Sequence, residues 1–194
     1  MFKKEDIEKF HIPRWEELPE IDLYLDQVVS FIDKYLLYYI NNDISQKDER
    51  KEQNVLTKTM INNYVKQKIM DAPIKKKYNR NNIAYLFVIC ILKQVYSINE
   101  IDKLIKFTLE TTPVEFAYNR FCDLLENSIK STFFDKKFVY EKSSNENSYV
   151  LLNVVQTIAS KLYVEKMYLE NQSKDDSKEE WYNWLKKQLY LLFC

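Results

Sequence analysis

The 194-residue sequence contains no glycine. Glycine makes up about 7% of the residues of an average protein. It alone reaches positive φ at little cost, and it lets the backbone approach a ligand closely. Phosphate-cradling loops, dinucleotide fingerprints, nucleophile elbows and calcium loops all need it. The sequence therefore excludes these four kinds of site. With only four prolines, it also favours helices over a turn-rich all-β fold, and we expect an all-α, mainly helical protein.

Catalytic chemistry has few suitable side chains. His11 is the one histidine, which argues against histidine triads and multi-histidine metal sites. Asp22 and Asp26 share a helix face, but no phosphate loop or nucleophile accompanies them, so solvated surface is the better interpretation. We expect no enzyme activity, no metal and no cofactor.

Cysteine usage and apolar patterning predict a soluble, cytoplasmic protein. The sequence has three cysteines: Cys90, Cys122 and Cys194. An odd number of cysteines without CxxC spacing is typical of structural thiols in a reducing compartment. A redox-sensing role is the lesser alternative. The N-terminus has no signal-peptide apolar core, and the longest apolar run, residues 83–92, is half a membrane span.

The net charge is zero, but the charges are unevenly distributed. Residues 1–43 carry a net charge of −5 and residues 141–180 a net charge of −3, whereas residues 56–80 hold seven basic side chains and one acidic one. A neutral protein with one concentrated basic segment has a candidate surface for a polyanion.

Apolar spacing and capping patterns predict about seven helices. They are expected at about 20–40, at 55–70, after caps at Asn79, Ser97 and Thr112, at 149–169, and after a capping box at residues 177–180. In the helix that starts after Thr112, Pro113 is expected at the first helical position. IAYLFVICIL is the expected central buried element. Residues 41–54 are expected to be a flexible connection, and residues 70–79 hold the only expected strand pair, a turn or very small hairpin.

Residues 55–105 resemble a known kind of domain. LTKTMINNYVKQKIMDAP, KKYNRNNI and LKQVYSINEIDKLI follow the order of the winged helix-turn-helix of MerR-type transcriptional regulators. DLYLDQ, LTKTMINNYVKQ, KKKY and LKQV more closely resemble an uncharacterised bacterial family, catalogued as domain of unknown function number 1836 and thought to be MerR-like. The resemblance covers roughly residues 20–110 and implies a DNA-binding transcriptional regulator.

This resemblance implies two regions. Residues 1–110 would form the DNA-binding region, with a long N-terminal helix, a recognition helix at 56–69 and a wing at 70–79. Residues 111–194 would form a C-terminal helical extension for dimerisation or effector binding.

The resemblance also implies individual roles. Thr57 takes the place of the serine that caps the recognition helix, Tyr64 that of a tyrosine on the DNA backbone, and Lys66 that of a basic residue. Lys76 and Tyr78 take the places of the basic residue and tyrosine of the wing.

The sequence departs from the MerR pattern at three glycines. Lys68 replaces the glycine at the end of the recognition helix, the wing glycine is missing from a shorter wing, and Val95 replaces the third. Because Lys68 must end a helix without the residue that enters the left-handed region cheaply, we expect the wing to leave this helix at an altered angle.

A recognition helix in the major groove would present one polar stripe to the bases. Asparagine amides on it can pair with adenine, and lysine or threonine with guanine or phosphate, while cations of the wing hold phosphates. The predicted DNA-binding residues are Lys58, Thr59, Asn62, Asn63, Tyr64, Lys66, Lys75, Lys76, Lys77, Tyr78 and Arg80. An ordinary solvated helix face and a solubilising lysine loop are the alternatives, and burial beneath the wing is the alternative for Tyr78.

The C-terminal helices carry more apolar surface than a terminal hairpin needs. The helix from Tyr149, continued by Trp181, Trp184 and Leu185, is compatible with a homodimer seam, with an effector pocket lined by aromatics, or with packing on the N-terminal helix. We favour a homodimer that binds double-stranded DNA, with a small-molecule or protein effector as a further possibility and no membrane partner. The alternative function is a helical protein-interaction module without DNA binding.

Overall fold

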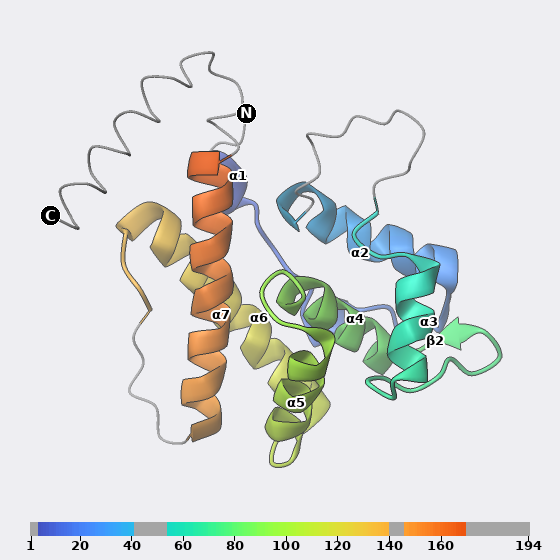
Figure 1. Cartoon of the computed structure of the whole chain (residues 1–194). Coiled ribbons are helices and arrows are strands. Elements are labelled where there is room, and N and C mark those ends of the chain that lie inside the picture. The colour runs from blue at the N-terminus through green and yellow to red at the C-terminus, as the bar shows by residue number, and fades with distance from the viewer. Residues whose placement is uncertain (1–3, 41–53, 140–145, 170–194) are drawn as a thin grey trace, which may run out of the picture.

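The structure is a computed structural model that describes residues 4–40, 54–139 and 146–169, and these residues are mainly helical (Figure 1). The α-helices are α1 (Lys4–Glu8), α2 (Leu25–Ile40), α3 (Lys58–Lys66), α4 (Arg80–Leu92), α5 (Ile98–Leu109), α6 (Val114–Lys130) and α7 (Glu146–Val164). A 3₁₀ turn spans Trp15–Glu17, and single π-helical turns follow α6 at Ser131–Asp135 and α7 at Glu165–Leu169. Strands β1 (Leu23–Tyr24) and β2 (Lys77–Tyr78) form an antiparallel pair. The expectation of a mainly helical protein is confirmed.

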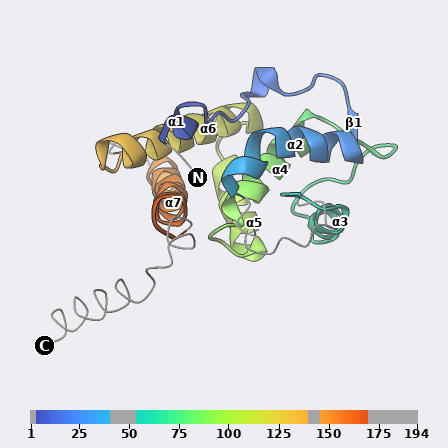
Figure 2. The same cartoon turned by 90° about the horizontal axis from the view of Figure 1, so that it is seen from above.

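Helix α4 is the centre of the fold (Figure 2). Nine of its 13 residues are buried, and α2, α5 and α6 pack around it. Phe87 contacts Phe31 and Tyr35 of α2 edge-to-face, with ring centroids 5.9 and 6.0 Å apart. A helix that is apolar on every face needs such coverage, so IAYLFVICIL is the central buried element that its composition predicts.

Two of the predicted helix starts form reciprocal capping boxes. At α4, the Asn79 and Asn82 side chains each accept a hydrogen bond from the backbone N–H of the other, at 3.0 and 3.1 Å. At α5, the Ser97 N–H donates to Glu100 at 2.8 Å, and the Ser97 hydroxyl accepts from the Glu100 N–H. Each box satisfies two backbone donors that the first helical turn leaves unpaired.

Other boundaries differ from the expectation. Helix α2 begins at Leu25 rather than near residue 20, because the two preceding residues pair with β2. Helix α6 begins at Val114 with Pro113 as its N-cap and without a side-chain cap, so the predicted Thr112 cap is wrong by one position. Helix α1 was not predicted.

Parts of the C-terminal prediction cannot be placed. The capping box at 177–180 and the helix with Trp181, Trp184 and Leu185 lie outside the described residues, as do Cys194 and the connection 41–53. Helix α7 begins three residues before Tyr149 and packs against α6.

An N-terminal strap, residues 10–18, ties the start of the chain to α6. The Ile12 N–H donates to Glu126 Oε1 at 2.9 Å, and Arg14 Nη1 makes an ion pair with the same oxygen at 2.7 Å. Burial alone raises the pKa of Glu126, but the hydrogen bonds from Arg14 and Ile12 outweigh it and hold this pKa below its usual value. Buried side chains on both sides of the expected boundary at residue 110 therefore belong to one core.

Both described cysteines are buried, Cys90 in α4 and Cys122 in α6. Burial raises the pKa of each thiol to about 12. Such thiols stay protonated at neutral pH and contribute as small apolar side chains. Among the described residues, no helix has both the length and the apolar character needed to cross a membrane.

Candidate nucleic-acid interface

Helix α3 has one buried and one exposed face. Thr57 caps it by accepting a hydrogen bond from the Met60 N–H at 3.3 Å, as predicted. Ile61 and Tyr64 pack into the core. The opposite face exposes the five predicted polar residues Lys58, Thr59, Asn62, Asn63 and Lys66. A helix of nine residues is marginal alone, so the cap and the buried face hold this polar stripe in place.

Two charged side chains from the neighbouring helices fix the entry to α3. The Val55 N–H donates to Asp33 Oδ1 of α2 at 2.9 Å. The Val55 carbonyl accepts from Lys93 Nζ, at the end of α4, at 2.7 Å. This clamp sets where α3 starts relative to α2 and α4. Sequence reasoning missed both clamp residues, because no local pattern links positions 22 and 38 residues away.

Helix α3 ends in a Schellman motif built on Lys68. Lys68 has φ 57°, its N–H donates to Val65 O at 3.0 Å, and the Ile69 N–H donates to Tyr64 O at 3.0 Å. Lys68 thus adopts the left-handed conformation that glycine usually supplies there, and the helix ends in the common way without glycine. Lys68 was not among the predicted DNA-binding residues, although its place opposite a family glycine is the signal that marks it.

The wing is a two-residue hairpin. Ile74 and Lys77 exchange backbone hydrogen bonds of 3.0 and 2.9 Å, and Lys75 and Lys76 between them have φ of 51° and 65°. Positive φ at both central positions is the mark of a type I′ turn. Both lysine side chains are exposed at the tip.

The predicted strand pair within residues 70–79 is only partly correct. The wing strand β2 also pairs with β1, which lies far from it in the sequence. In the antiparallel register of β1 and β2, Leu23 lies opposite Tyr78 and Tyr24 opposite Lys77. The Lys77 ammonium lies 5.2 Å from the centre of the Tyr24 ring, which is a cation–π contact. The segment before α2 therefore supports the wing.

The two predicted tyrosines lie inside the protein. Tyr64 is 7% and Tyr78 5% exposed. Burial raises the pKa of Tyr64 to about 12 and raises that of Tyr78. The resemblance implies that Tyr64 contacts the DNA backbone, but its side chain lies on the buried face of α3 and does not fit that role. Tyr78 is buried beneath the wing, which is the alternative to DNA contact for this residue.

Arg80 is only partly available. It lies at the start of α4, where its side chain is 25% exposed. The guanidinium is 3.8 Å from Glu20 and 5.7 Å from the centre of the Trp15 ring. Arg80 thus links the wing end of α4 to the segment that leads into β1, and it adds less free charge to the surface than the lysines do.

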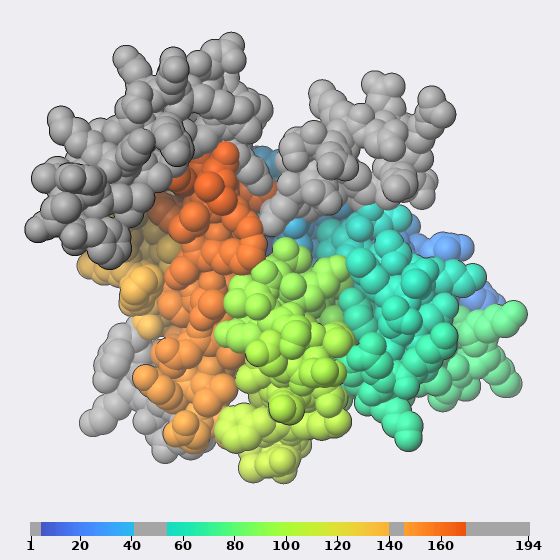
Figure 3. Space-filling model, in the orientation of Figure 1, coloured from blue at the N-terminus to red at the C-terminus, as the bar shows by residue number. Residues whose placement is uncertain are grey.

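Helix α3 and the wing lie side by side at the end of the molecule opposite α7 (Figure 3). Five exposed lysines occupy this end, and none of them makes an ion pair within the described ranges: Lys58, Lys66, Lys68, Lys75 and Lys76. We call these five lysines, with Asn62 and Asn63 of α3, the basic end. It combines cations that can bind phosphates with amides that can bind base edges.

Comparison with known proteins gives one match. The sequence model of a family described as "Domain of unknown function (DUF1836)" matches residues 13–121. The match begins in the N-terminal strap and ends within α6, so it includes α2, α3, the wing, α4 and α5. No curated protein and no solved structure matches the chain.

Proposed function

This chain belongs to the DUF1836 family, and we propose that it is a sequence-specific DNA-binding transcriptional regulator with a MerR-like winged helix-turn-helix. Helix α3 enters the major groove, and the lysines of the wing hold the phosphate backbone on the flank. Because phosphate contacts carry no sequence information, the amides of α3 supply the specificity.

The observation that carries this proposal is the composition of the basic end. Its five lysines are exposed and have no acidic partner among the residues that the structure describes, although the chain as a whole is neutral. Such a surface attracts a polyanion through the release of its counterions. A merely solubilising surface does not need two asparagine amides on the same short helix face.

The arrangement of the supporting helices agrees with this use. The Val55 clamp fixes α3 against α2 and α4, and α4 also begins where β2 ends. The recognition helix and the wing are therefore both attached to the buried helix α4. This attachment keeps the distance between them constant when both contact one DNA duplex.

The C-terminal half supplies the proposed homodimer surface. Phe116 of α6, Phe138 after it, and Tyr149 of α7 are large side chains that are more than half exposed. Pairing of two copies through such residues lets two basic ends meet half-sites of a palindrome. The same exposed residues favour the alternative function, a protein-interaction module without DNA binding.

A random-oligonucleotide selection with the purified protein, followed by a gel-shift salt titration, tests the proposal. We expect a recovered palindrome and a log–log salt slope near −5, for about six neutralised phosphates. The triple substitution of Lys75, Lys76 and Lys77 by alanine should weaken binding strongly. Lys130→Ala, at the exposed last residue of α6 and outside the basic end, is the control.

Two results would contradict the proposal: no binding at low salt, or binding that the triple substitution leaves unchanged. A stoichiometric protein partner, recovered from cells together with no enrichment of DNA, would then support the interaction module instead.

A further inference from the structure

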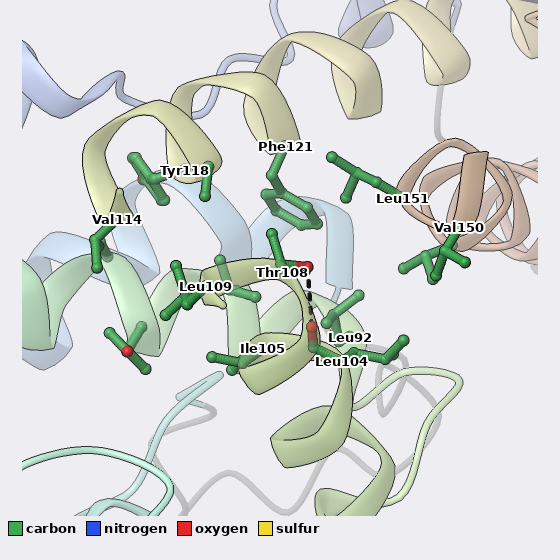
Figure 4. A pocket seen from close by; sticks show the side chains of 15 residues that line it. Leu92, Leu104, Ile105, Thr108, Leu109, Val114, Tyr118, Phe121, Val150 and Leu151 are labelled. Carbon is green, nitrogen blue, oxygen red and sulfur yellow. Dashed lines mark hydrogen bonds between the residues drawn. The ribbon is translucent and has the colours of Figure 1, made fainter. Parts of the chain in front are cut away.

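A cavity lies where α4, α5, α6 and α7 meet (Figure 4). Its volume is about 80 Å³. Tyr85 and Val88 of α4 line one side, Leu104 of α5 another, and Phe121 of α6 and Leu151 of α7 close it. Close-packed interiors leave few voids larger than a water molecule. A single water needs only about 10–15 Å³ of such space, so this cavity has room for a small ligand.

The wall of this cavity is apolar. None of its lining side chains, all of them described residues, carries a charge. Three lining residues carry a hydroxyl group: Tyr85, Thr108 and Tyr118. The Thr108 hydroxyl donates to Leu104 O at 2.9 Å and the Tyr118 hydroxyl donates to Pro13 O at 2.9 Å, so the Tyr85 hydroxyl is the one polar group of these described side chains left for a neutral ligand. A charged ligand would be buried here without compensation, which is strongly unfavourable.

Helix α4 links this cavity to the basic end. Near its start, Asn82 Nδ2 donates to Asp71 O, ahead of the wing turn, at 3.1 Å. Just past its end, Lys93 holds the Val55 carbonyl ahead of α3. Val88 and Leu92 lie between these two attachments and line the cavity. A ligand that packs on the middle of α4 therefore acts on the helix that holds both DNA-facing elements.

We propose that this cavity binds a neutral, mainly apolar small molecule, of the class of medium-chain alcohols or unsubstituted aromatic rings, and that its occupancy changes how readily the wing and the end of α3 open. Together with the proposed function, on which its regulatory meaning rests, this makes the cavity the effector site of the regulator. It differs from the effector pocket expected from the sequence, because helices α4 and α5 form a large part of its wall.

Binding is tested with the whole chain and the neutral fluorescent probe 1-aminoanthracene. We expect one saturable site per chain, from which 1-octanol displaces the probe much better than octanoate does. Val88→Phe and Leu109→Phe, which fill the cavity, should weaken probe binding at least about tenfold. Ile74→Phe adds the same ring at an exposed position outside the cavity and should leave binding unchanged.

Thermal unfolding identifies which filled variants fold. Unchanged probe affinity in a folded filled variant overturns the proposal. So does equal displacement by octanol and octanoate, which is measured on the unmodified chain and needs no variant.

Coupling is tested by amide hydrogen exchange with and without saturating 1-octanol. We expect the exchange rates of the Lys77 and Ile69 amides, which donate within the wing and at the end of α3, to change by about fivefold. Unchanged rates at saturation overturn the coupling. Because neither measurement uses DNA, a failure of DNA binding contradicts only the proposed function and is distinguishable from a failure of the site.

Discussion

Lys75 and Lys76 both adopt positive φ, and together they form the turn that joins Ile74 to Lys77. A type I′ turn strongly prefers asparagine and glycine at these two positions, because the left-handed conformation costs other residues about 1–2 kcal/mol each. All four residues with positive φ in the described chain are lysines. In a protein without glycine, the least favourable backbone positions are thus also positions of positive charge.

Replacement of the turn pair should stabilise the protein. Lys75→Asn combined with Lys76→Gly supplies the preferred type I′ residues and should raise the free energy of unfolding by about 1–2 kcal/mol. Urea denaturation measures this change. Lys77→Gly, which introduces glycine at a neighbouring lysine that pairs with β1, is the control and should destabilise the protein. A double variant that is no more stable than the parent would show that the turn is unstrained.

The same reasoning separates charge from conformation at Lys68. Lys68→Gly keeps the left-handed helix end and should raise stability by about 1 kcal/mol. If Lys68 contacts a phosphate, this variant should also bind DNA more weakly, with a log–log salt slope smaller by about 0.9. Lys68→Arg keeps the charge and should bind as the parent does. Equal DNA affinity for the glycine and arginine variants would remove Lys68 from the interface.

Local patterns in the sequence predicted the parts of the fold that local forces determine. The Ser97 box is closed within four residues, and the apolar run of α4 can only be satisfied by burial. The pairing of Leu23 with Tyr78 could not be predicted, because two-residue strands carry no periodic signal and the partners are far apart. The Arg14–Glu126 ion pair, which spans 112 residues, is hidden for the same reason.

In the candidate site too, the sequence predicted what depends on local pattern and missed what depends on tertiary contacts. Helical periodicity placed Asn62 and Lys66 on the exposed stripe of α3, because amphipathic spacing reports burial directly. The resemblance placed Tyr64 on DNA, but periodicity alone sets it on the buried side with Ile61, and the structure agrees with the periodicity. The clamp by Lys93 depends on tertiary contacts and left no sequence signal.

The α3 amides should control sequence preference rather than overall affinity. Asn62→Ala and Asn63→Ala should each cost about 1–3 kcal/mol on the selected palindrome and relax its consensus at one position. Binding to non-specific DNA should hardly change. Both side chains are exposed, so circular dichroism melting should show unaltered stability. Equal losses on specific and non-specific DNA would contradict a role in base readout.

The N-terminal strap should make stability depend on pH through Glu126. Its folded pKa lies below the usual value, so the stabilisation is present above about pH 4.5 and is lost as the pH falls through the folded pKa. Glu126→Gln weakens the ion pair with Arg14 and should cost about 1–3 kcal/mol at pH 7. Urea denaturation from pH 7 to 3 should show this difference shrinking with acid. A constant difference would mean that Glu126 does not titrate with folding.

Replacement of Ser128 by alanine should stabilise the protein. Its side chain is fully buried in α6, and its hydroxyl has no hydrogen-bond partner among the described residues. A buried hydroxyl without a partner loses its hydrogen bonds to water on folding and gains none within the protein. Ser128→Ala should therefore raise the free energy of unfolding by about 1 kcal/mol. Ser97→Ala makes the same chemical change at a hydroxyl that caps α5, and it should lower stability by about 1 kcal/mol. Opposite signs for the two substitutions in urea denaturation are the expected result, and a loss of stability in both would mean that the Ser128 hydroxyl is hydrogen-bonded in solution.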